Sequence, residues 1–138
     1  LNNMYMKIFI ESLVFAIVLL SIDVPWIMTV MKSSYETLFK KLKLKLRDNI
    51  PGAAMAYLVL ASAYPLLLYD IKDKETRLKK AAMLGFLIYG TYAFTLYAIL
   101  PVYSLKLALT ETVWGAFLFT ITTWLVDLIN KTAFSSVV

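Results

Sequence analysis

The sequence predicts an all-α integral membrane protein, a four-helix bundle with an amphipathic interfacial helix in its first loop. Of the 138 residues, 61% are apolar, well above the roughly 45–50% found in soluble domains. Four apolar stretches each approach the about 20 residues that a helix needs to cross the hydrocarbon core. Short segments rich in lysine separate these stretches. One transmembrane domain, residues 1–138, accounts for the whole chain.

The predicted spans follow the apolar stretches, and their even number leaves both termini on one side of the membrane. Lys and Arg do not fix the orientation, because seven lie on the terminal side and seven on the other. Only the tendency of the first helix to dominate favours termini outside. A bacterial, organellar or viral membrane would all suit the composition. The spans are 8–31, 51–69, 81–100 and 107–129.

The first loop contains a candidate interfacial helix over residues 34–47. Ser33 and Glu36 have the spacing of a capping box, and apolar residues from Tyr35 onward then recur on one helical stripe. The alternation over residues 42–46 would also suit a strand, but a lone strand would leave its backbone groups unpaired. We interpret this helix as a surface for lipid headgroups or a partner, with a solvated linker as the alternative. Its cations are Lys40, Lys41, Lys43, Lys45 and Arg47.

The other two loops predict how the last two spans are arranged. Asp73 is a suitable N-cap for a helix that runs through Arg77 and Lys80 into the third span. The third loop, residues 101–106, is short enough to place the last two spans side by side and antiparallel. Gly85, Gly90 and Gly115 are expected to be points of close approach between helices.

The composition excludes most enzyme chemistry. A chain without His or Cys lacks the residues of Ser-His-Asp and Cys-His catalysis, of the usual zinc and haem sites, and of disulfides. No glycine string suits a nucleotide. We therefore expect no enzymatic activity, no cofactor and no metal. Nucleic acid is not an expected partner, because only Arg47 and Arg77 carry the forked guanidinium suited to it.

Carboxylates inside membrane helices are costly, by about 2.5–3.5 kcal/mol at mid-helix, and therefore need an explanation. Glu11 and Asp127 lie near the terminal-side ends of their spans, where water can reach them. Asp23 and Glu111 lie deeper, about 12 Å and about 6 Å from the first-loop side at about 1.5 Å per residue. The cations expected to pair with the first two are Lys7, Lys79, Lys80 and Lys131.

All four spans carry polar residues in the half of the bilayer that holds Asp23 and Glu111. If these residues turn inward, they form one intramembrane polar cluster that opens toward the first loop. Trp26 and Trp114, each three residues after an acid, would wall the cluster, and Pro25 would kink the helix beside it. The cluster is either a functional site or a packing clasp. Its members are Asp23, Tyr57, Thr91, Tyr92, Thr95 and Glu111.

The order of these motifs resembles the small four-helix membrane proteins catalogued as domain-of-unknown-function family 2177. The resemblance covers nearly the whole chain and implies a fold but no activity. The family pattern has Asp at Ala93, Asn at Leu96 and Asp at Glu111. The motifs are residues 22–26, Tyr35, Tyr57, Gly85, residues 89–92, Thr95 and residues 111–115.

Two functions remain open from the sequence. The first is a structural or accessory subunit of a larger membrane assembly, in contact with the lipid bilayer and with other subunits or copies of itself. It is favoured by the small size and by Ala93 and Leu96 at the family's polar positions. The second is a small proton-coupled or solute transporter that uses Asp23 and Glu111. An enzyme acting on a lipid is a third, for which the sequence supplies no nucleophile or phosphate clamp.

Overall fold

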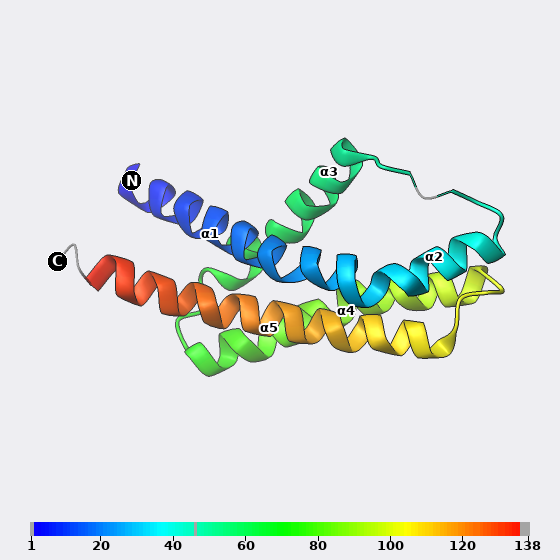
Figure 1. Ribbon diagram of the computed structural model, residues 1–138. Coiled ribbons are helices and arrows are strands. Elements are labelled where there is room, and N and C mark those ends of the chain that lie inside the picture. The colour runs from blue at the N-terminus through cyan, green and yellow to red at the C-terminus, as the bar shows by residue number, and fades with distance from the viewer. Residues whose placement is uncertain (1, 46, 136–138) are drawn as a thin grey trace.

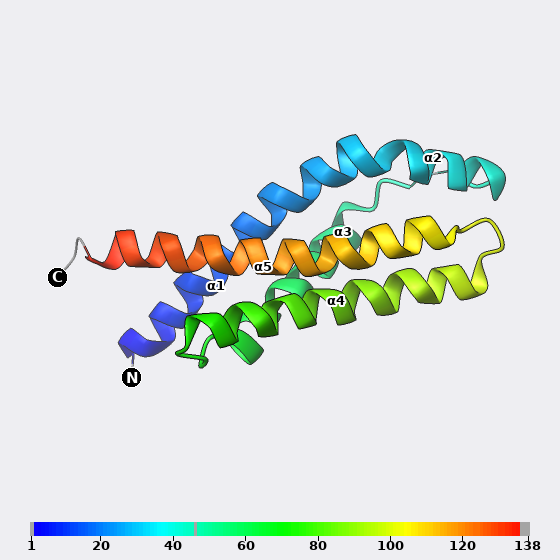
Figure 2. The same ribbon diagram turned by 90° about the horizontal axis from the view of Figure 1, so that it is seen from below.

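The structure, a computed structural model, describes residues 2–45 and 47–135, and within them all regular structure is helical. Within these described residues, four helical segments are long and apolar enough to cross a membrane. Both termini lie at one end of the molecule (Figure 1 and Figure 2). The predicted all-α membrane fold is therefore confirmed. The segments are Asn2–Lys41, Ile50–Leu68, Lys74–Ile99 and Leu105–Ala133.

The first segment is one long helix with a bend. Helix α1 (Asn2–Trp26) passes through a π-helical turn, η1 (Ile27–Met31), into α2 (Lys32–Lys41). Pro25 has no N–H to donate, so the regular hydrogen-bond ladder is interrupted at this point. The chain changes direction between its blue and cyan parts (Figure 2), as the predicted kink requires.

The amphipathic segment of the first loop differs from its predicted bounds. Ser33 and Glu36 form no capping box, because the helix continues uninterrupted through Ser33 and has no free N-terminus there. The helix ends at Lys41 rather than residue 47, and Lys43 has a left-handed φ of 55°. Closely spaced like charges disfavour a further turn. Lys40 and Lys41 therefore lie on the last turn, whereas Lys43, Lys45 and Arg47 follow it, and all five are exposed.

The remaining helices begin at side-chain caps. Asn49 accepts a hydrogen bond from the Gly52 N–H (3.2 Å) at the start of α3 (Ile50–Ala61), and the π-helical turn η2 (Tyr64–Leu68) follows. Helix α4 (Lys74–Ile99) begins at Asp73, whose Oδ2 accepts from the Thr76 N–H at 2.8 Å. That cap confirms the prediction. The last helix is α5 (Leu105–Ser135).

Helices α4 and α5 form the closest pair, antiparallel and side by side (Figure 1 and Figure 2). Two glycines allow this approach. A Cβ added to Gly85 would lie 2.0 Å from the Gly115 carbonyl oxygen, and one added to Gly115 would lie 2.4 Å from the Tyr89 Cβ. Small residues let membrane helices pack backbone to backbone. The predicted antiparallel pair and its glycine contacts are confirmed.

The other two spans are attached through α1. Its buried residues, Glu11, Phe15, Leu19 and Asp23, are four apart and so share one stripe. On that stripe the Phe15 ring stacks on Tyr64 at 5.1 Å between centroids. Helix α3 contacts mainly α1 and leans away from the other helices (Figure 1). The bundle thus consists of a tight α4–α5 hairpin, with α1 packed mainly on α5 and α3 attached through α1.

Candidate functional site

The Asp23 carboxylate lies where all four spans meet. It is 3% exposed. Its Oδ2 accepts from the Tyr57 hydroxyl of α3 at 2.6 Å and, at 3.4 Å, from the Tyr89 hydroxyl of α4. Its Oδ1 accepts from Trp114 Nε1 of α5 at 2.8 Å. Both carboxylate oxygens are therefore bound by aromatic donors, as a buried acid requires.

Trp114, which donates to this carboxylate, is stacked on a second tryptophan. The Trp26 and Trp114 rings are nearly parallel, with an angle of 5° and centroids 4.0 Å apart. Trp114 is thus both the predicted wall and a hydrogen-bond donor, while Pro25 is exposed on the outside of the bend.

Glu111 occupies a separate layer, closer to the first loop. It is 6% exposed, and its Oε1 accepts from the Tyr35 hydroxyl of α2 at 3.4 Å. Tyr92 and Tyr103 are close enough to interact electrostatically with Tyr35 and Glu111. Burial, followed by the Glu111 carboxylate, raises the pKa of Tyr103, in the loop before α5, to about 12. Among the described residues, Glu111 therefore has one long hydrogen bond where Asp23 has three.

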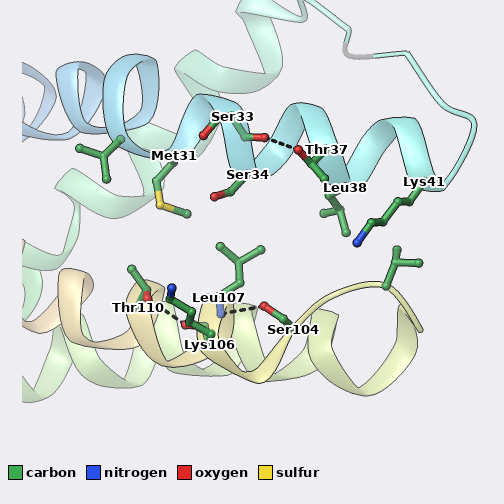
Figure 3. Close-up of a pocket in the computed structure, with 12 residues that line it drawn as sticks. Met31, Ser33, Ser34, Thr37, Leu38, Lys41, Ser104, Lys106, Leu107 and Thr110 are labelled. Carbon is green, nitrogen blue, oxygen red and sulfur yellow. Dashed lines mark hydrogen bonds between the residues drawn. The ribbon is translucent and has the colours of Figure 1, made fainter.

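A cavity of about 430 Å³ lies beside the Glu111 layer, between α2 and the start of α5. Figure 3 shows Lys41 reaching from α2 toward α5, where Lys106 lies on the opposite wall. Thr110, the neighbour of Glu111, lines it too, with its hydroxyl donating to the Lys106 carbonyl at 2.8 Å. The lining holds two lysines, several hydroxyls and no carboxylate, so its formal charge is positive.

The predicted cluster of six polar residues is only partly assembled. Asp23 bonds Tyr57, and Glu111 lies near Tyr92, which is nevertheless 53% exposed. Thr91 and Thr95 are exposed on the outer side of α4. The prediction of a single cluster was wrong, because equal depth along a helix does not imply equal direction around it.

The prediction also overlooked two donors. Tyr89 lies four residues after Gly85, so both belong to the face of α4 that packs against α5. Thr91 is six residues after Gly85, or about 240° around the helix at 100° per residue. The position of Gly85 could therefore have identified Tyr89, and not Thr91, as the side chain of α4 that faces α5. No local signal identifies Tyr35, because its contact with Glu111 depends on the bend after Pro25.

The two terminal-side carboxylates are buried instead of reaching water. Glu11 is 6% exposed, and its Oε2 accepts from the Tyr64 hydroxyl at 2.9 Å. Lys7 Nζ lies 3.8 Å from its Oε1, as predicted. Asp127, 8% exposed, pairs with Arg77 rather than with any of the lysines expected beside it. Within the described part of the chain, no three acidic side chains converge as a metal site would require.

The fold and these buried acids define a multi-pass membrane protein whose four helices are joined through carboxylates. The family model described as a predicted membrane protein (DUF2177) matches residues 7–128, and the chain belongs to that family. This confirms the resemblance found in the sequence. No curated protein and no solved structure matches the chain.

Proposed function

We propose that the protein is a non-enzymatic structural or accessory subunit of a larger membrane assembly. The observation that carries the proposal is that both oxygens of the buried Asp23 carboxylate accept hydrogen bonds, from Tyr57, Tyr89 and Trp114. A carboxylate that must bind and release an ion or proton needs access and a spare hydrogen-bonding position. Asp23 is buried, and both of its oxygens already accept hydrogen bonds from other helices, so its geometry suits a clasp that fixes helix packing.

The residues at the family's polar positions support the same role. Ala93 is fully buried and packs with Leu38, Tyr103 and Ala108, and Leu96 packs against this cluster. Where the family pattern carries Asp and Asn, this chain fills the space beside Glu111 with apolar groups. Chemistry that needed those polar groups would be lost, whereas packing would be retained.

Native mass spectrometry of the protein, extracted from its own membrane in mild detergent, tests the proposal. We expect a stoichiometric set of other subunits to accompany the chain. Recovery of the chain only as a monomer or homo-oligomer would contradict the subunit role. In reconstituted vesicles, Asp23→Asn with Glu111→Gln is expected to lower thermal stability without abolishing any flux.

Transport is the second candidate, and Glu111 favours it. Its single 3.4 Å hydrogen bond leaves acceptor capacity, and its neighbour Thr110 lines the 430 Å³ cavity on the first-loop side. A buried carboxylate with spare acceptor capacity, one residue from a cavity wall, could exchange a proton with a solute. Proteoliposomes carrying a pH gradient would then show a flux that Glu111→Gln abolishes while Asp23→Asn, matched in charge, reduces only stability. Equal flux in protein-free vesicles would rule this candidate out.

A further inference from the structure

A second cavity, of about 390 Å³, lies at the terminal end of the bundle, remote from the Asp23 and Glu111 layers. Its volume falls in the range of about 300–1,000 Å³ typical of ligand pockets. Helices α1, α4 and α5 and the segment before α4 all contribute to its wall. Five cations surround it: Lys7, Lys72, Lys74, Arg77 and Lys131.

The cavity has a net positive charge. Glu11 and Asp127 are its two carboxylates, which leaves a formal excess of three positive charges. Both are engaged from within the protein: Tyr64 and Lys7 contact Glu11, and Arg77 pairs with Asp127. An anion entering the cavity would therefore meet acids already neutralised by partners, and cations still in excess.

The guanidinium of Arg77 is held rigidly in the wall of the cavity. Its Nε and Nη2 donate to the Ile71 carbonyl at 2.9 and 2.5 Å, and its Nη1 donates to Asp127. Lys72, Lys74 and Lys131, which also line the cavity, are exposed. Because Arg77 is engaged within the protein, the ammonium groups of the three exposed lysines are the donors left to bind phosphate oxygens.

The position of the cavity indicates which phosphate it binds. Lys72 and Lys74 flank the start of α4 and Lys131 lies near the end of α5, so the cations lie at headgroup depth. On α5, the exposed Trp124 lies seven residues, or two turns, before Lys131 and so continues its side of the helix into the hydrocarbon. Basic pockets between membrane helices bind anionic lipid headgroups in this way. We propose that this cavity binds the phosphate of an anionic phospholipid, with an acyl chain lying against α5.

Native mass spectrometry of the full chain, titrated with phosphatidylglycerol, phosphatidylcholine or inorganic phosphate, tests this site. The test variant is Lys72→Gln/Lys74→Gln/Lys131→Gln, which changes exposed side chains only. At about fivefold per lysine, its affinity for phosphatidylglycerol should fall roughly a hundredfold. The matched control removes the same charge from three exposed lysines that do not line this cavity: Lys32→Gln/Lys80→Gln/Lys106→Gln.

The proposal requires that the control change the phosphatidylglycerol affinity less than about threefold and that phosphatidylcholine bind much more weakly. Equal losses in the two triple variants would show that binding follows overall charge and would overturn the site. Inorganic phosphate that displaces the lipid at equal concentration would reassign the cavity to a free anion. Circular dichroism melting of both variants verifies that any loss occurs in folded protein.

Discussion

Replacing Gly85 by Ala tests the packing on which both carboxylate layers depend. The added Cβ would lie 2.0 Å from the Gly115 carbonyl oxygen, whereas ordinary contacts begin near 3.4 Å. Helices α4 and α5 must therefore separate by about 1.4 Å at this point. The obstacle is backbone and cannot rotate aside, so the helices themselves must move.

The expected loss follows from two opposing contributions. Overpacking costs about 1–3 kcal/mol, and a backbone obstacle places Gly85→Ala at the upper end. Alanine recovers up to about 1 kcal/mol through its helix propensity. The net loss should therefore be about 2 kcal/mol, measured by thermal and denaturant unfolding in detergent. Separation of the helices should also weaken the Tyr89 contact to Asp23, which is already 3.4 Å long.

Gly90→Ala is the matched control on the same helix. Its Cβ would lie 3.2 Å from Thr112 Cγ2, a side-chain methyl that can shift. We expect this variant to be as stable as the wild type or up to about 1 kcal/mol more stable, through propensity alone. If the Gly85→Ala and Gly90→Ala variants unfolded at the same temperature, the contact between Gly85 and Gly115 would not set the spacing of α4 and α5.

Three further predictions follow from other parts of the molecule. Arg77→Gln should lower stability by about 3 kcal/mol, because it leaves Asp127 buried without its cation; an unchanged unfolding midpoint would contradict this. Hydrogen bonds from Thr76 lower the pKa of Asp73, so its cap stabilises the fold above the ordinary Asp pKa and is lost as pH falls through the lowered value; Asp73→Asn should remove that pH dependence from melting curves. Because the chain has no cysteine, Lys40→Cys and Lys74→Cys should react with an impermeant maleimide from opposite sides of sealed vesicles, and same-side labelling would refute four spans.

The spans were predictable because they depend on quantities that are local in the sequence. The length of an apolar run, the missing N–H of Pro25 and the cap at Asp73 each act within one or two helical turns. The depth of a residue along its helix was also predictable, and equal depth correctly placed Asp23 beside Tyr57. The direction of a side chain around its helix was not, because it depends on which face packs. Thr95 was misplaced for this reason.

The pairing of Arg77 with Asp127 could not be found from local sequence, because it depends on how α4 is aligned with α5. That alignment is set where Gly85 meets Gly115. Arg77 precedes the first glycine by eight residues and Asp127 follows the second by twelve, so an antiparallel pair brings them within one turn of each other. The two glycines therefore predict the pairing of Arg77 with Asp127, but only once the two helices are known to be neighbours.

Asp23 connects the two halves of the bundle. Among the hydrogen bonds of the described residues, those of Asp23 link α1 to α3, α4 and α5 together. Within α3, Met55, Leu58 and Val59 are each more than half exposed, whereas the η2 turn that follows is held by Tyr64, which bonds Glu11 and stacks on Phe15. The α4–α5 pair has its glycine contact and its own ion pair. Loss of the Asp23 carboxylate should therefore loosen α3 from the bundle, because Tyr57 loses its partner, while Tyr64 still holds η2 and α4 stays paired with α5.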